Sequence, residues 1–247
     1  LWALGAWLAW LLLRDWPQLV LAALLTPLWL AGEWIEATHG FSGRETILTE
    51  GLLLLAVSYL SATLPEQETP MRKALTWLGA LALIPAVCAV VASGDFSHTH
   101  QPLPAGYHAA GRTAALLLPL LLTWLLRGRH VWWNLLACVW VLALGELGQI
   151  MFEDRSASAW RQLLQYALCA LGAVGLMAWG LGEARKERIN LGIAGFALTV
   201  LAFYFSSVMD KLGRSASLIG LGLLFLGGGW LLEKTRRRLL ARLETRP

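Results

Sequence analysis

Charged residues are scarce in this chain. Asp, Glu, Lys and Arg make up 15% of the sequence, whereas hydrophobic residues make up 57% and the mean hydropathy is +0.58. Soluble domains carry about 25% charged residues, so this composition excludes an ordinary soluble fold. The cations lie in short turns and at the C-terminus, not on one face. We therefore interpret the net charge of +4 as a determinant of membrane topology and expect no nucleic-acid partner.

Motifs of the common enzyme classes are also absent. The sequence contains no phosphate-binding loop, no Gly-x-Ser-x-Gly nucleophile elbow, no His-Glu-x-x-His zinc motif and no Cys-x-x-Cys-His haem site. Cys88, Cys138 and Cys169 each lie inside an apolar run, without the spacing of a metal cage or a disulfide framework. Matching pairs of interrupted helices, which are typical of inverted-repeat transporters, are missing as well. We expect a protein without enzymatic activity.

Long apolar runs are what the sequence does have. They are continuous rather than alternating, which favours membrane helices over the strands of a barrel. Bounded by charges and turn residues, they predict nine helices: Leu1–Leu13, Pro17–Ile35, Ile47–Leu64, Arg72–Ser93, Thr113–Leu126, Val131–Phe152, Trp160–Gly182, Ile189–Val208 and Ala216–Leu232. We expect an all-α polytopic transmembrane helix bundle over residues 1–233 and a basic cytoplasmic tail over residues 234–247.

The positive charges predict an orientation for the nine crossings. Six of the 20 Lys and Arg residues fall on one side: Arg44, Arg112, Arg155, Arg161, Lys211 and Arg214. The other side carries the rest, including the tail, and basic loops favour the cytoplasm. We therefore expect a cytoplasmic C-terminus. Because the chain begins at Leu1 within an apolar stretch, we expect a further segment upstream, and a tenth helix there would return the N-terminus to the cytoplasm.

Polar residues that suggest chemistry gather on the predicted outer side. They are Glu33, Glu36 and His39 at the end of the second helix, Glu50 in the first turn of the third, His98, His100 and His108 in the long loop before the fifth, and Glu146 with Gln149 in the sixth. Imidazole is a ligand for zinc and other divalent metals, so the three loop histidines are candidate metal ligands. A solvated loop and a partner-binding surface are the alternatives.

A carboxylate inside an apolar run is costly and is therefore a functional candidate. Glu146 is the strongest, either as a site for transported protons or cations or as a structural residue paired with Gln149 or a backbone carbonyl. Glu33, Glu36, His39, Glu50 and Gln149 would complete a transport site on the same side. For Glu33 and Glu50 the alternative is a side chain that only extends to the nearby membrane interface. In the tail, Arg236, Arg237 and Arg238 predict contact with lipid headgroups, and the alternative is an ordinary stop-transfer flank.

Glycines in the last three helices predict close helix packing. Gly175, Gly192 and Gly195 are examples. Small residues let two helix backbones come close together, and such close packing holds helices together in lipid, where the hydrophobic effect does not drive their association. The run Gly227-Gly228-Gly229 predicts a loosened turn near the end of the last helix.

The last 60 or so residues carry a family resemblance. Glu187–Phe205, Leu212–Leu226 and Trp230–Arg238, together with Trp29–Glu36, resemble a family of bacterial multi-pass membrane proteins classed as a domain of unknown function. Members of that family tend to be encoded beside a small membrane-anchored protein with a GDYXXLXY motif. The resemblance implies a bacterial inner-membrane protein with a partner of that type. It implies no catalytic residues.

These observations favour a non-enzymatic subunit or scaffold of an envelope complex. Its outer loops, Glu36–Arg44 and Gly94–Arg112, would receive the partner. A proton- or cation-coupled transporter that uses Glu146 is the first alternative. A membrane protein that binds zinc or another divalent metal in its outer histidine loop is the second.

Overall fold

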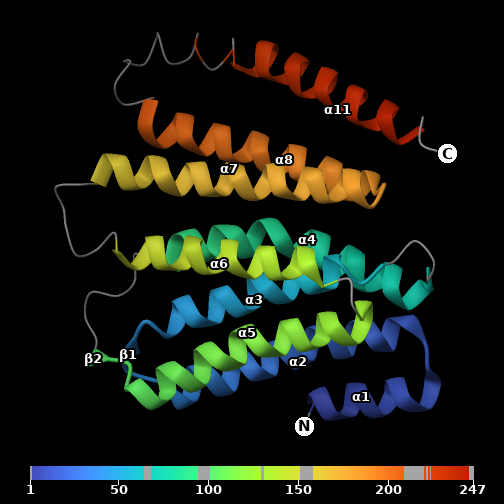
Figure 1. The fold of residues 1–247 in the computed structure, drawn as a ribbon. Helices are drawn as coiled ribbons and strands as arrows, with labels where there is room; N and C mark the ends of the chain where they lie inside the picture. Colours follow the sequence, from blue (N-terminus) through green and yellow to red (C-terminus); the bar gives the residue numbers. More distant parts are fainter. Residues whose placement is uncertain are drawn as a thin grey trace. The chain divides into compact units, whose positions relative to one another are not determined.

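The structure is a computed structural model that describes residues 2–63, 68–93, 101–128, 131–150, 158–208, 220, 222 and 224–244. Within these ranges the α-helices are α1 (Trp2–Leu13), α2 (Trp16–Ala37), α3 (Arg44–Leu60), α4 (Pro70–Ser93), α5 (Ala105–Arg127), α6 (Trp132–Ile150), α7 (Ser158–Gly182), α8 (Lys186–Phe203) and α11 (Gly229–Glu244) (Figure 1). Two π-helical turns, Tyr204–Val208 and Leu224–Gly228, and the short strands β1 (Phe41–Ser42) and β2 (Gln101–Pro102) complete the described elements. The predicted all-α fold is confirmed.

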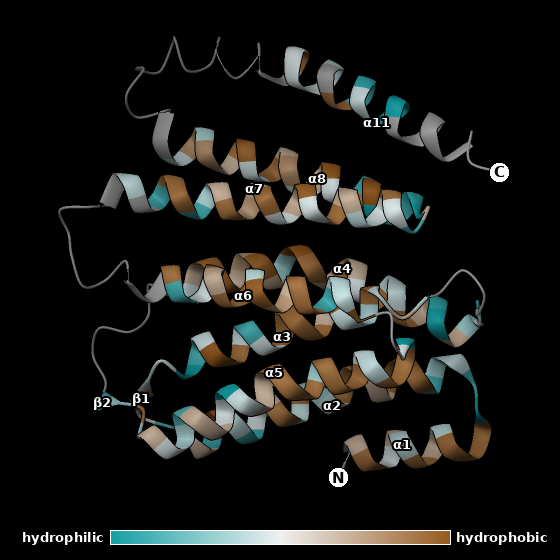
Figure 2. Cartoon of the chain, in the orientation of Figure 1, coloured by the Kyte–Doolittle hydropathy of each residue, from teal (hydrophilic) through white to brown (hydrophobic). Residues whose placement is uncertain are grey.

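Five of the described helices are long and apolar enough to cross a membrane. They are α2, α4, α5, the segment Gln162–Gly182 of α7, and Lys186–Ser206, which comprises α8 and part of the following π-turn. Hydrophobic residues dominate the helices of residues 1–155 (Figure 2). Many large apolar side chains point outward, and Trp77 and Leu81 are 66% and 72% exposed. Because so much exposed apolar surface would be unfavourable in water, the chain is an integral membrane protein.

The chain divides into two compact units, residues 1–155 and 156–247. In the first unit α3 is the central helix, since it packs against α2, α4, α5 and α6. Leu53, Leu54 and Leu60 are almost completely buried, as expected for a helix that is hydrophobic nearly all round. Its contact with α4 is especially close at Gly79, where an added Cβ would lie 2.3 Å from the Leu60 backbone nitrogen. Glycine is therefore required at this crossing.

In the second unit α7 and α8 form a helical hairpin. Gly192 confirms the predicted close packing, because a Cβ there would lie 2.8 Å from the Ala173 carbonyl oxygen. Gly175 does not, because nothing lies within 4 Å of its Cβ position. At the turn, the buried Arg188 forms an ion pair with Glu183. The Arg188 guanidinium also lies 4.3 Å from the centre of the Trp179 ring, which adds a cation–π contact.

Two predicted helix boundaries are wrong. Helix α5 begins at Ala105 rather than Thr113, so Tyr107, His108 and Arg112 are helical and not part of a loop. Pro104 at the N-cap explains the early start, because proline is compatible with the first turn of a helix. The basic tail is helical through Glu244, since Leu, Lys, Arg and Glu are strong helix formers.

Other predicted features of the helices agree with the structure or lie outside the described residues. Pro27 and Pro85 lie inside α2 and α4, as expected. Gly227 and Gly228 lie in the π-helical turn before α11, which is the loosened turn that the glycine run predicts. The first part of the predicted ninth helix, residues 216–219, lies outside the described residues.

Candidate functional site

Three charged residues meet between three helices of the first unit. Glu50 comes from α3, Arg112 from α5 and Glu146 from α6. The Arg112 Nη2 group donates a hydrogen bond to Glu146 Oε1 and forms an ion pair with it. Glu50 lies within electrostatic reach of both residues. We call these three residues the Glu–Arg–Glu cluster.

Glu50 is the buried member of the cluster, with 2% of its surface exposed. Its carboxyl group lies against Gly145 of α6, where an added Cβ would be 1.9 Å from Glu50 Oε1. Glycine therefore opens the space that the carboxyl group occupies. No hydrogen bond to this carboxyl group occurs within the part of the chain that the structure describes. A buried carboxylate in this position must be protonated or compensated by the neighbouring charges.

The ion pair itself is more accessible than Glu50. The side chains of Arg112 and Glu146 are 29% and 48% exposed. Sequence reasoning found both glutamates but missed Arg112, which it assigned to the loop before the fifth helix. The signal that could have found it is Pro104, which marks a helix start and places Arg112 two turns inside α5.

Among the described residues, the polar candidates Glu33, Glu36 and His39 form no hydrogen bond or ion pair with this cluster. Glu33 accepts a hydrogen bond of 3.0 Å from Trp29 Nε1 on the same helix. Glu36 and His39 are exposed at the end of α2. The Gln149 side chain lies outside the described residues, so its predicted pairing with Glu146 stays a prediction.

The two predicted outer loops do meet. Strand β1 follows α2 and pairs in parallel with β2, which precedes α5, and Ser42 Oγ donates a hydrogen bond of 3.3 Å to the Gln101 carbonyl (Figure 1). His39 and His108 flank this pairing in the chain, whereas His98 and His100 lie outside the described residues. Among the residues with described positions, no three His, Cys, Asp or Glu side chains are grouped to hold a metal. The metal site therefore stays a prediction.

A second polar network lies at the other end of α3. Thr123 Oγ1 on α5 lies 2.9 Å from Ser58 Oγ on α3, and Asn134 Nδ2 on α6 donates to Ser61 Oγ at 3.1 Å and to Thr123 Oγ1 at 3.3 Å. Arg127, which is 5% exposed, donates to the Ser61 carbonyl at 3.1 Å. All five residues are buried. Hydrogen bonds of this kind hold membrane helices together.

Apolar side chains separate this network from the Glu–Arg–Glu cluster. Glu50 and Ser58 are two helical turns apart on α3, which is about 12 Å along the axis. Leu53, Leu54 and Val57 lie between them and are buried, as are Val141 and Leu144 on α6. The described residues therefore form no continuous polar path along α3.

The three tail arginines have different surroundings. Arg236 Nε donates a hydrogen bond of 2.9 Å to Asn190 Oδ1 and so joins α11 to α8. Arg237 Nε donates to Glu233 at 2.8 Å, and Arg238 is exposed. Hydrogen bonds from Arg237 and Arg236 hold the pKa of Glu233 below its usual range. Arg238 is the best placed of the three for a lipid headgroup, and that contact stays a prediction.

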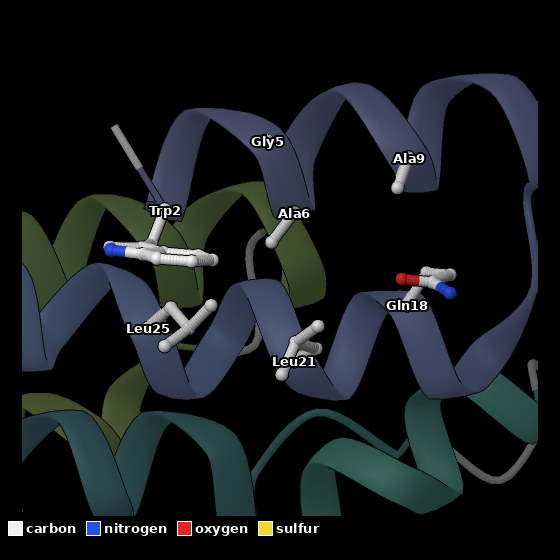
Figure 3. Close-up of a pocket in the computed structure, with 7 residues that line it drawn as sticks. All are labelled: Trp2, Gly5, Ala6, Ala9, Gln18, Leu21 and Leu25. Carbon is white, nitrogen blue, oxygen red and sulfur yellow. The ribbon is translucent and has the colours of Figure 1, made fainter.

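One pocket lies between α1 and α2 (Figure 3). Its lining residues are Trp2, Gly5, Ala6, Ala9, Gln18, Leu21 and Leu25. The lining is mostly apolar, and its polar side-chain groups are the Gln18 amide and the Trp2 indole N–H. This pocket offers no acid, base or nucleophile. Within the described part of the chain, the Glu–Arg–Glu cluster and the paired loops are the candidate sites. No protein-family model, curated protein or solved structure matches the chain.

Proposed function

We propose that this protein is a non-enzymatic subunit or scaffold of an envelope complex in a bacterial inner membrane. The observation that carries the proposal is the pairing of β1 with β2. This pairing joins the α2–α3 connection to residues 101–104, the described end of the α4–α5 connection, and the two segments are far apart in the sequence. A surface built from two loops is better suited to receiving a partner than a single mobile loop, because less conformational entropy is lost on binding.

Contacts of the helices next to this loop surface favour a rigid surface. Helix α3 follows β1 directly and is held to α5 and α6 by the buried network around Ser58, Thr123 and Asn134. Trp34 on α2 donates a hydrogen bond of 3.1 Å to the Arg44 carbonyl at the start of α3. These contacts support a binding role for the loops rather than a role as a moving gate.

The partner and the orientation belong to the same proposal. The family resemblance supports a small membrane-anchored protein with a GDYXXLXY motif as the partner. The excess of Lys and Arg on the side of the tail supports a cytoplasmic C-terminus. Arg127 and Arg188 are buried and contribute to packing. When these two residues are left out of the count, Lys and Arg are still in clear excess on the side of the tail.

Affinity purification from the native membrane tests the proposal. The full-length protein should bring down one partner in stoichiometric amount. Adding negative charge to the loop surface, with His39→Asp and Gln101→Glu combined, should reduce the recovered partner at least tenfold, which corresponds to about 1.4 kcal/mol of binding energy. Lys234→Ala, an exposed change on α11, is the matched control and should recover the partner as the wild type does. Equal recovery with the loop variant would contradict the proposal.

A second candidate is a transporter coupled to protons or cations. The specific observation in its favour is the Glu–Arg–Glu cluster, because ionisable residues between membrane helices mark proton and ion sites. Substrate-dependent flux into liposomes should then be lost with Glu146→Gln and retained with Glu187→Gln, an exposed carboxylate on α8. Flux that survives Glu146→Gln would end this candidate.

A further inference from the structure

We propose that Glu50 is a proton-binding site, and that its protonation decides whether Arg112 pairs with Glu146 alone or is shared between the two carboxylates. The site lies inside the helix bundle and needs no partner protein. It therefore stands or falls independently of the loop surface proposed above.

The geometry supplies the first argument. Glu50 is buried, its carboxyl group is held against Gly145, and it has no hydrogen bond among the described residues. Gly145 is the chain neighbour of Glu146, so the Glu50 carboxyl group lies beside the ion pair without being part of it. The Glu50 carboxyl group therefore lies next to Arg112 and Glu146, which already form an ion pair with one another.

The charges supply the second argument. Two carboxylates and one guanidinium leave one uncompensated negative charge when all three are ionised. A buried charge that lacks a partner is costly, whereas one added proton makes the cluster neutral. Glu146 already accepts a hydrogen bond from Arg112 and is about half exposed, so ionisation costs it less. The proton therefore resides on Glu50.

The ligand is a proton rather than a metal ion. Metal cations that bind oxygen need several oxygen ligands, and a guanidinium beside the carboxyl group repels them. Among the described residues, no group of three His, Cys, Asp or Glu side chains forms such a set around Glu50.

Few other titratable groups act on Glu50. Arg112 faces it from α5, and Glu146 faces it from α6. Cys138 on α6 also lies within its electrostatic reach. The remaining ionisable residues of the adjoining helix segments are Glu33, Glu36 and His39 on α2, Arg44 and Glu45 on α3, Cys88 on α4, and Tyr107 and His108 on α5. Arg44 and Glu45 pair with one another.

Proton exchange involves one bond. A proton taken from water forms an O–H bond on the Glu50 carboxyl group, and release returns it to water past the exposed Glu146. After release, the Glu50 carboxylate attracts the Arg112 guanidinium and weakens its pairing with Glu146. The protonation state is thereby converted into a change of contact between α3, α5 and α6.

Infrared difference spectroscopy of the full chain in liposomes tests the proposal. Between acidic and alkaline buffer, the wild type should show a titrating C=O band of a buried protonated carboxyl group. Glu50→Gln should lose this band, and Glu50→Asp should keep one at a shifted frequency. The control Glu36→Gln, at an exposed carboxylate, should leave the band unchanged.

Three outcomes would overturn the proposal. One is a wild type without such a band, and another is a band that persists in Glu50→Gln. The third is a titration midpoint that moves when sodium is replaced by choline, because it would mean that a cation competes for the site. Since Glu50→Asp keeps a carboxyl group, its shifted band tests the assignment even if Glu50→Gln does not fold.

Discussion

Gly145 determines where the Glu50 carboxyl group lies. A methyl group at this position would lie 1.9 Å from Glu50 Oε1, so Gly145→Ala must displace the carboxyl group or separate α3 from α6. We expect the variant to lose about 1–3 kcal/mol of stability, as is typical of overpacking. Denaturant unfolding of the purified protein in detergent measures this loss.

The control for this prediction is Gly32→Ala in α2, where nothing lies within 4 Å of the Cβ position. We expect it to be neutral or to stabilise the helix slightly, because alanine is the better helix former. If Gly145→Ala unfolds at the same denaturant concentration as Gly32→Ala, the carboxyl group does not occupy the position described.

In the second unit, Arg188 is the buried charged residue at the turn between α7 and α8. Its side chain is 1% exposed, pairs with Glu183 and covers Trp179. Arg188→Ala removes the cation that pairs with the nearly buried Glu183 carboxylate, which also accepts a hydrogen bond from Trp179 Nε1. We expect a loss of about 3–5 kcal/mol, because a buried charge then loses its counter-charge. Thermal unfolding compared with Arg238→Ala, an exposed change on α11, measures it. Similar melting temperatures for the two variants would mean that the pair contributes little.

At the level of elements, hydroxyl and amide groups hold α3, α5 and α6 together. Thr123→Val keeps the shape of the side chain but removes the hydroxyl group that contacts Ser58 and Asn134. We expect a loss of about 1 kcal/mol, the usual size of a hydrogen bond between membrane helices. Thr113→Val changes an exposed threonine of the same helix and should have little effect. Equal unfolding of both variants would count against the network.

For the whole molecule, the charge distribution predicts that residue 39 and residue 73 lie on opposite sides of the membrane. In a variant without the three native cysteines, His39→Cys should react with an impermeant thiol reagent added outside intact cells. Lys73→Cys should react only after the membrane is opened. Both positions are exposed, so access does not depend on local unfolding. Labelling of Lys73→Cys in intact cells would reverse the proposed orientation.

The sequence predicts some of the candidate site and not the rest. Glu146 stands out because charges inside apolar runs are rare, and this signal is local. Glu50 is a weaker candidate in the sequence, because the first turn of the third predicted helix is close to the membrane interface, and the structure shows that it is buried. Arg112 does not stand out, because its role depends on where α5 begins and on which helix faces it. Gly145 could not be recognised either, since many glycines occur in the chain and only the position of Glu50 makes this one necessary.

Composition and apolar run length determined that this is a helical membrane protein, because both are properties of the chain alone. The tertiary structure decided that α3 is the central helix of the first unit, that β1 and β2 join two distant loops, and that Arg112 pairs with Glu146 beside the buried Glu50 carboxyl group. These features depend on contacts between segments far apart in the sequence. No local pattern encodes such contacts, because they result from how all the helices of a unit fill the same space.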